Sequence, residues 1–537
     1  MNRIREFCTK HYYLLTSVLM FMSFPSYDVW FLKAFPFFAW IALAPVFIYV
    51  RDKKPREVYL SAFLAGLLGN FLAYEWIGNF GAAVTGGYAV ILGFLMPSLS
   101  VFFALKIFAA EMIARRFEKL RPLVFPAVWL FVDWIQTIGF LAYPLPNWAY
   151  SQYPFTPFIQ MASLTGIMGI TFVIVLVNYL LAELVRAGGL RAAPVRGILR
   201  MKEARLLGIA LAFVAAMTAY GAAVMALNTG AGKSGLRVAM VQSCISPWEN
   251  WSENRFSYLA ELKRYTGKAM GDRPDLVIWS ESATLETISY DYEQGMLNEF
   301  DQEVLALARQ NERPLLTGEI GVVEDYSDII LRRYPQNNAV LINAGGEVVG
   351  SYAKIHLVPF GEWFPYEKWL GFVKRITESM GGSSFVPGDK PKVFEVGGRK
   401  FGVLICYEGI SQRLCRTYRA MGAEYFVNIT NDGWTDTFRG HMQHFSASKF
   451  RAVENGIWYL RAGNTGYTAF IDPYGRIRKS IPILKKGFLV DEIDFSLNHR
   501  TLYALIGDLF LYLAMAFVIA LAGIMVFEKV RSSAVKK

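Results

Sequence analysis

The sequence predicts a multi-pass α-helical membrane domain joined to an α/β domain. Of the 537 residues, 54% are hydrophobic, which is more than soluble proteins usually contain. Apolar stretches of membrane-spanning length recur before residue 228. Beyond Gly235, short apolar runs such as "LRVAMVQ" and "FGVLICYE" alternate with polar helical stretches, a pattern typical of α/β domains.

Eight apolar stretches reach or approach the roughly 20 residues that a helix needs to cross a bilayer. They lie at 12–24, 32–50, 58–79, 88–113, 122–138, 158–185, 206–227 and 503–527. The first and fifth are short, so the count of about eight helices depends on them. Residues 1–24 resemble a signal peptide but lack a small-residue cleavage site, so we expect an uncleaved first helix.

Lys and Arg cluster in alternate loops, as expected when cytoplasmic loops hold the basic excess. The clusters lie at 3–10, 51–56, 115–121, 186–205 and 529–537, whereas loops 25–31, 80–86 and 139–157 contain neither residue type. Both termini are therefore expected in the cytoplasm, with residues 228–502 on the other side. The expected domains are 1–227 (helices 1 to 7), 228–502 (α/β) and 503–537 (helix 8 and a cytoplasmic tail).

The net charge of +11 does not indicate a nucleic-acid-binding protein. Residues 228–502 hold 32 Lys and Arg against 32 Asp and Glu, so the whole excess belongs to the membrane part. The cysteines Cys8, Cys244, Cys406 and Cys415 show no zinc-site spacing, and a disulfide between Cys244 and Cys415 stays open. We expect no metal and no cofactor.

Three chemically capable side chains follow apolar strand-like runs. Glu281 follows "LVIWS", Lys354 follows "VVGSYA" and Cys406 follows "FGVLI". Ligands of α/β sheets collect at the carboxyl ends of strands, so the fold can bring these three together. A cysteine is nucleophilic as thiolate, which Glu281 could generate by taking the proton and Lys354 could stabilise. Alternatively, Glu281 and Lys354 could be solvated charges at strand ends and Cys406 a buried core cysteine.

The segments around these residues resemble the Glu, Lys and Cys motifs of the nitrilase (carbon–nitrogen hydrolase) superfamily. The membrane segments together with "KIHLVPFGEWFP", "ICYEGI", "NITNDGW" and "RAGNTG" resemble the apolipoprotein N-acyltransferase family over the full chain. The resemblance implies a nitrilase-like α-β-β-α sandwich on the periplasmic or extracytoplasmic side of a bacterial inner membrane. It also implies a monomer.

The same resemblance implies the chemistry. Cys406 would take a fatty acyl chain from a membrane phospholipid as a thioester, and the N-terminal α-amine of a diacylated apolipoprotein would then receive it as an amide. Glu281 would be the general base and Lys354 the oxyanion stabiliser. Further expected site residues, supporting or substrate-binding, are Glu362, Tyr407, Glu408, Trp251 and Asn338.

Other polar residues have two interpretations each. His441 and His444 lie three apart on an expected helix, but no set of partners for a metal is visible. Glu75 and Asp133 lie inside apolar stretches, where they could be functional or could form a polar link between helices. Residues 362–385 are expected to form either a membrane-dipping arm or a folded flap.

Two rival functions remain from the sequence. A membrane-tethered amidase with water as acceptor would use the same three residues but would not need about eight helices. A transporter carrying an α/β appendage would concentrate charged residues in the apolar stretches, which this chain does not do.

Overall fold

The computed structural model describes residues 3–33, 35–81, 87–139, 143–188, 201–230, 235–325, 332–359, 361–363, 385–435 and 437–535. The chain divides into two compact units. The first comprises residues 1–78, 89–226 and 505–537, and the second comprises 79–88 and 227–504.

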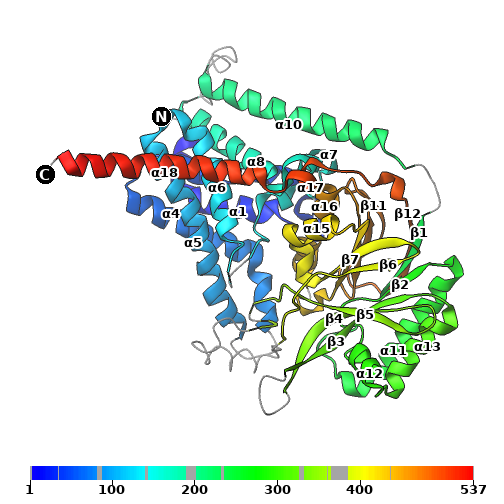
Figure 1. Ribbon diagram of the computed structural model, residues 1–537. Coiled ribbons are helices and arrows are strands. Elements are labelled where there is room, and N and C mark those ends of the chain that lie inside the picture. Colours follow the sequence, from blue (N-terminus) through cyan, green and yellow to red (C-terminus); the bar gives the residue numbers. More distant parts are fainter. Residues whose placement is uncertain are drawn as a thin grey trace. The chain divides into compact units, whose positions relative to one another are not determined.

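Helices make up the first unit (Figure 1). In chain order they are α1 (Arg3–Ser23), α2 (Trp30–Lys33), η1 (Pro36–Trp40), α3 (Ala44–Val50), α4 (Pro55–Tyr74), η2 (Glu75–Gly81), α5 (Gly87–Arg116), η3 (Glu118–Leu120), α6 (Arg121–Ile135), η4 (Trp148–Gln152), α7 (Thr156–Ile159), α8 (Ala162–Arg186), α10 (Lys202–Leu227), α17 (Leu502–Ile506) and α18 (Leu509–Val535). η2, α5 and α17 cross the boundary between the units.

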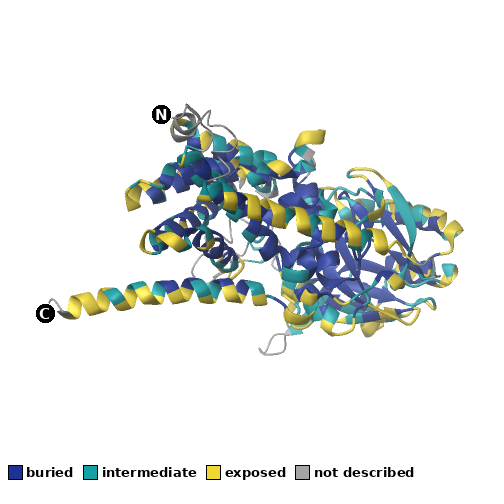
Figure 2. Ribbon diagram, turned by 90° about the horizontal axis from the view of Figure 1, so that it is seen from above, coloured by how far each residue is buried: buried dark blue, intermediate teal, exposed yellow. Residues whose placement is uncertain are grey.

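Six stretches among the described residues are helical, long and apolar enough to cross a membrane. They are 30–50, 55–79, 92–116, 162–186, 202–227 and 509–534, which correspond to six of the eight stretches expected from the sequence. The fifth expected stretch forms α6, which has 15 residues. The count of eight therefore stays a prediction. Figure 2 shows α18, which ends at the C-terminus, exposed along much of its length, as lipid-facing helices require.

Asp133, one of the two acidic residues inside apolar stretches, forms a buried ion pair in the first unit. Its carboxylate lies 2.5 Å from Lys106 Nζ, which joins α6 to α5. The same ammonium donates to Gln136, and Asn147 donates to Asp133. This contact favours the polar link between helices for Asp133. Glu75 lies at the first position of η2.

The second unit contains two six-stranded sheets (Figure 1). The first has the strand order β12-β1-β2-β3-β4-β5 and the second β11-β10-β9-β8-β7-β6. The strands are β1 (Leu236–Gln242), β2 (Leu276–Ile278), β3 (Leu315–Asp325), β4 (Arg332–Ile342), β5 (Val348–Ala353), β6 (Val393–Val396), β7 (Arg399–Ile405), β8 (Tyr425–Thr430), β9 (Trp458–Gly463), β10 (Thr468–Ile471), β11 (Ile477–Ile481) and β12 (Gly487–Ile493).

Helices cover the outer face of each sheet. The helices of the unit are α11 (Trp251–Ala269), α12 (Ile288–Gln294), α13 (Glu299–Asn311), α15 (Gln412–Ala420) and α16 (Phe438–Asn455), with short turns η5 (Met270–Asp272), η6 (Cys406–Ile410), η7 (Asp432–Trp434) and η8 (Phe495–Leu497). Trp279, Phe300 and Leu262 join α11 and α13 to the first sheet in one apolar core. β1 contacts β9 and β4 contacts β7, so the sheets pack against each other. The result is the α-β-β-α sandwich expected from the sequence.

Parallel pairing brings the carboxyl ends of neighbouring strands to the same edge of each sheet. β1, β2 and β3 run parallel, as do β7, β8 and β9. β8 and β9 are buried at every position, which explains their nearly continuous apolar sequence. β4 and β5 form a hairpin, because they pair antiparallel around a turn in which Gly346 has a φ of +79°.

The end of β2 requires a glycine on its neighbour. Gly318 of β3 lies so close to the chain after β2 that a Cβ there would come within 2.4 Å of Ser282 N and 2.8 Å of Glu281 Cα. Ser282 itself has a φ of +50°. Because the obstructing atoms belong to the backbone, no side-chain rotation can relieve the clash.

Gly318→Ala should therefore destabilise the protein by about 1–3 kcal/mol, the usual range for overpacking. The midpoint of thermal unfolding of the detergent-solubilised protein, followed by intrinsic fluorescence, measures this. Gly267→Ala on α11 is the matched control, because a Cβ there meets nothing within 4 Å and alanine is the better helix former. Equal midpoints for the two variants would contradict the close approach.

Candidate active site

The three strand-end residues converge in the structure. Glu281, Lys354 and Cys406 follow β2, β5 and β7. Lys354 Nζ lies 3.5 Å from Glu281 Oε1, and both carboxylates, Glu281 and Glu362, act electrostatically on the Cys406 thiol together with Lys354. A nucleophile, a carboxylate base and a cation are thus within one buried cluster, the combination that acyl transfer through a cysteine needs.

Lys354 is fully buried and remains charged. Its Nζ donates to Glu362 Oε1 over 2.8 Å. Burial alone would lower the pKa of Lys354, but Glu362, Glu281 and Cys406 beside it raise that pKa well above its ordinary value. A permanent positive charge therefore lies next to the sulfur.

Asn337 and two backbone amides fix both carboxylates. Asn337 Nδ2 donates to Glu281 Oε1 (2.8 Å) and to Glu362 Oε1 (2.9 Å). Asn431 N donates to Glu281 Oε2 over 2.7 Å, and Val358 N donates to Glu362 Oε2 over 2.8 Å. Asn337 was not among the site residues expected from the sequence, although its neighbour Asn338 was. It lies opposite Lys354 in the β4–β5 hairpin, where Lys354 N donates to the Asn337 carbonyl over 2.8 Å.

The surroundings of the Cys406 thiol raise its pKa. Burial raises its pKa, Glu281 adds to the rise, and Lys354 opposes it only in part, so the pKa of Cys406 lies well above the ordinary range. Lys354 does stabilise the thiolate, as expected from the sequence, but burial and the nearby carboxylates disfavour the thiolate more strongly. The proton must therefore leave during the attack, to a base within the cluster.

The backbone at Cys406 is strained. Its φ is +51°, a left-handed conformation that costs a non-glycine residue on the order of 1–3 kcal/mol and is found mainly at functional sites. Asn428 Nδ2 donates to the Cys406 carbonyl oxygen over 3.3 Å and to that of Leu404 over 3.0 Å. The turn η6, which begins at Cys406, starts from this sharp change of direction.

Glu408 joins the Cys406 loop to the Lys354 loop. Its Oε2 accepts from Ile405 N (2.9 Å), and its Oε1 accepts from Tyr352 Oη (2.8 Å) and from the amides of Ile355 (2.7 Å) and His356 (3.1 Å). Burial raises the pKa of Glu408 to about 7 against the pull of these donors. Glu408 therefore connects the end of β7 in one sheet to the end of β5 in the other.

A second polar cluster lies beside the cysteine. Cys406, Asp432 and His444 each present a ligand-type atom within 4.8 Å of the other two. Asp432 Oδ1 accepts from His444 Nδ1 over 2.7 Å, and Asp432 Oδ2 accepts from Arg461 over 2.6 Å. The spacing alone would suit a metal ion, but the Arg461 guanidinium bound to the same carboxylate would repel a divalent cation.

The charge state of Asp432 follows from these partners. Burial would raise its pKa, but Arg461 and His444 hold the pKa of this carboxyl well below its usual range. Asp432 follows the strand β8, so the rule applied to Glu281 and Cys406 could have found it. His444 was considered only as a metal ligand paired with His441, and the sequence holds no signal that joins it to Cys406.

Three expected site residues have no described contact with Glu281, Lys354 or Cys406. Trp251 donates to Glu286 over 2.9 Å and packs against Phe300 and Tyr258. Asn338 packs over Gly321 of β3, because successive side chains of a strand point to opposite faces and Asn337 faces the cluster. Tyr407 is half-buried next to Cys406 on η6. Their roles toward a substrate stay predictions.

Two further expectations concern the cysteines and the arm. Cys244 and Cys415 are both free thiols, so the disulfide that the sequence left open is not formed.

Most of the expected arm 362–385, including its Gly381–Gly382 pair, lies outside the described residues. Trp363 forms an isolated bridge with Pro359.

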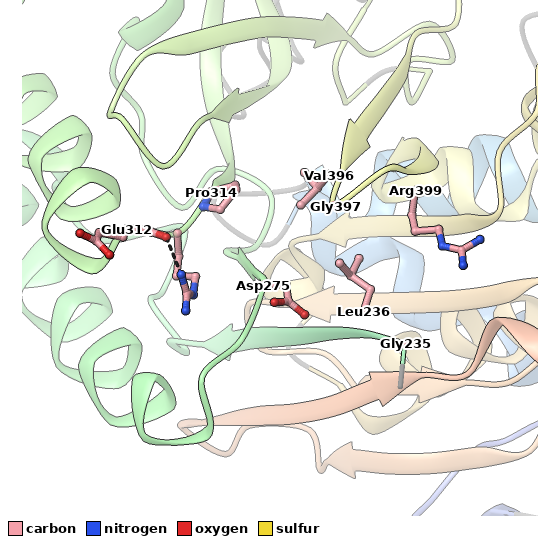
Figure 3. A pocket seen from close by; sticks show the side chains of 9 residues that line it. Gly235, Leu236, Asp275, Glu312, Pro314, Val396, Gly397 and Arg399 are labelled. Carbon is pink, nitrogen blue, oxygen red and sulfur yellow. Dashed lines mark hydrogen bonds between the residues drawn. The ribbon is translucent and has the colours of Figure 1, made fainter. Parts of the chain in front are cut away.

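A surface cavity of about 450 Å³ in the same unit does not belong to this site (Figure 3). Gly235, Asp275 and Pro314, which line it, precede β1, β2 and β3. Glu281 follows the carboxyl end of β2, so the cavity and the cluster lie at opposite ends of these strands.

Comparisons with known proteins match both parts of the chain. Residues 237–501 match the family model of carbon-nitrogen hydrolases, and residues 16–180 match that of the apolipoprotein N-acyltransferase N-terminal domain. The chain is 30% identical over 517 residues to an apolipoprotein N-acyltransferase of Geobacter metallireducens, covering 94% of this chain and 92% of the relative. It is 29% identical to apolipoprotein N-acyltransferase 1 of Treponema denticola, over 93% and 92% of the two chains.

Among solved structures, an amidase of Nesterenkonia AN1 from the nitrilase superfamily aligns at 21% identity. The alignment covers 50% of this chain and 95% of that chain, with a TM-score of 0.36. The family assignment rests on the sequence matches.

Glu408→Gln tests the contact between the two loops. The amide NH₂ of glutamine would face the donor Ile405 N or the donors on the other side, which leaves a buried donor unpaired at a cost of about 1–3 kcal/mol. We expect a lower midpoint of thermal unfolding and slower labelling of Cys406 by a small thiol reagent. Glu395→Gln on β6, an exposed position, is the control and should change neither. Wild-type values for Glu408→Gln would contradict the assigned contact.

Proposed function

The chain belongs to the apolipoprotein N-acyltransferase family, and on that basis we propose that Cys406 carries the acyl group, with Glu281 as base and Lys354 as oxyanion stabiliser. The protein is a bacterial membrane acyltransferase of lipoprotein biosynthesis. The observation that carries the residue assignment is the convergence of the three side chains at the ends of β2, β5 and β7.

In the first half-reaction, the Cys406 sulfur attacks the ester carbonyl of a phospholipid acyl chain while Glu281 takes the thiol proton. A C–S bond forms, and the negative charge that develops on the carbonyl oxygen is stabilised by the Lys354 ammonium. The ester C–O bond then breaks. Glu281 returns its proton to the departing alkoxide, which leaves as a lysophospholipid, and the acyl group stays on sulfur as a thioester.

In the second half-reaction, the N-terminal amine of a diacylglyceryl-cysteine attacks the thioester carbonyl. A C–N bond forms and the C–S bond breaks, so that the lipoprotein gains an amide and Cys406 regains a proton. Glu362 supports both steps because it shares Lys354 with Glu281 and keeps the ammonium in place.

The membrane unit explains why such a reaction would be carried out by a chain with so many apolar helices. Donor and acceptor are both lipid-anchored in this proposal, so neither has to leave the bilayer. The basic clusters at alternate loops support a topology with both termini in the cytoplasm and residues 228–502 on the periplasmic side.

The rival amidase, with water as acceptor, is not the function that the relatives support. Two relatives named as apolipoprotein N-acyltransferases match more than nine tenths of this chain, including the helices that an amidase would not need.

Cys406→Ser tests the nucleophile. Purified wild-type protein incubated with a phospholipid labelled in its acyl chain should gain a hydroxylamine-sensitive adduct on Cys406, located by mass spectrometry. Serine has a far higher pKa than cysteine, so the variant should show no adduct and negligible turnover. Label found instead on Cys244 or Cys415 would overturn the assignment.

Glu281→Gln and Lys354→Met test the base and the oxyanion stabiliser. The first substitution keeps the shape but cannot take the thiol proton, and the second removes the charge, so each should slow thioester formation about 100-fold or more. Lys390→Met, at an exposed position, should leave the rate unchanged. If either active-site variant forms the thioester at the wild-type rate and fails only at amide formation, the roles are wrong.

A further inference from the structure

Amide formation needs more proton transfers than thioester formation does. This inference rests on the proposed function. In the first half-reaction one proton leaves the thiol and one reaches the leaving alkoxide. An α-amino group has a pKa of about 7.7–8.0, so at neutral pH the acceptor is mainly an ammonium ion. Its nitrogen must lose one proton before the attack and a second after it, while the sulfur takes back only one.

Glu281 accounts for one of these two protons. It can take the second proton from nitrogen and deliver it to the departing sulfur. This is the reverse of the first half-reaction, in which Glu281 takes the proton from the thiol. Both of its oxygens already accept hydrogen bonds, from Asn337 on one side and Asn431 on the other. The proton that is released to solvent therefore calls for a second base near the sulfur.

His444 has the geometry of such a base. One of its ring nitrogens lies within 4.8 Å of Cys406 Sγ. Its Nδ1 lies 2.7 Å from Asp432 Oδ1, and its buried Nε2 has no hydrogen-bond partner among the described residues. Nδ1 also lies 3.3 Å from the Arg461 guanidinium. In the tautomer whose Nδ1–H donates to the Asp432 carboxylate, the lone pair of the neutral ring is on Nε2.

The surroundings of His444 hold this arrangement. Arg461, fully buried, donates to Asp432 Oδ2 over 2.6 Å and to Asn428 Oδ1 over 2.8 Å. Asn428 in turn holds the carbonyl of Cys406. Arg461 and Asn428 therefore connect two parts of the site. At one end they hold the Asp432 carboxylate, which orients the His444 ring, and at the other end they hold the backbone of Cys406. The His444 side chain as a whole is 11% exposed.

We propose that His444 is a further catalytic residue, the base that takes the first proton from the acceptor ammonium in the amide-forming half-reaction. The N–H bond of the ammonium breaks, its electron pair stays on nitrogen, and the proton moves to the imidazole and then to solvent. The neutral amine attacks the thioester carbonyl, which is one bond from Sγ, and a ring nitrogen of His444 lies within 4.8 Å of that sulfur. The base has to come within hydrogen-bonding reach of the attacking nitrogen.

The experiment measures the two half-reactions separately. His444→Ala and His444→Gln are first loaded with labelled phospholipid, and the rate of thioester formation is recorded. A diacylated lipopeptide with a free N-terminal amine is then added, and loss of the thioester is followed. We expect thioester formation within about threefold of wild type and amide formation slower by about 100-fold, the usual size of a general-base effect.

Two further measurements separate a base from a structural residue. Hydroxylamine is a neutral nucleophile at neutral pH, so it should discharge the thioester of His444→Ala at the wild-type rate. Added imidazole should restore amide formation in His444→Ala, where a cavity admits it, and not in His444→Gln. His441→Ala is the matched control on the same helix, because both His441 nitrogens already contact Thr437 and Thr465. It should keep the wild-type ratio of the two rates.

The outcomes distinguish this inference from the proposed function. If wild-type Cys406 never gains an acyl group, the proposed function fails. If the thioester forms and His444→Ala converts it to amide at the wild-type rate, or if both half-reactions fall equally and imidazole restores neither, the role of His444 fails alone.

Discussion

The catalytic unit depends on one buried ammonium. Lys354 is fully buried, and an ion without partners would be too costly to keep there. Two carboxylates, Glu281 and Glu362, make the charge tolerable, and each of them is in turn held by Asn337 and a backbone amide. The group that would stabilise an oxyanion is therefore charged and fixed before any substrate arrives, so no reorganisation is needed during the reaction.

That ammonium has to face a strained cysteine from the other sheet, which requires a firm connection between the two. Glu408 makes it, because its oxygens accept from the strand end before Cys406 and from the loop after Lys354. A carboxylate with four donors is costly to bury, but it fixes two loops at once. The left-handed backbone at Cys406 persists because β7, Asn428 and Glu408 all hold it.

In the proposed mechanism, the two polar clusters divide the proton transfers of the reaction. Glu281 would exchange one proton with the sulfur, and Asn337 and Asn431 keep it in position. In the same mechanism, His444 with Asp432 offers a lone pair to a different group, the incoming amine. An amidase that uses water needs no such second base, because water carries no ammonium proton. The extra base thus matches the amine acceptor of the proposed function.

The sequence by itself determined six helices of membrane-spanning length, the α/β class and the three strand-end residues, because apolar runs and the polar residue that ends each run are local signals. It could not decide between Asn337 and Asn338, since a shift of one residue reverses the face of the strand. Nor could it join Cys406 to His444 and Arg461, which follow it by tens of residues on α16 and β9, or pair β12 with β1 at the other end of the domain. Only the tertiary structure decided those contacts, because pairing between distant segments leaves no periodic pattern in either one.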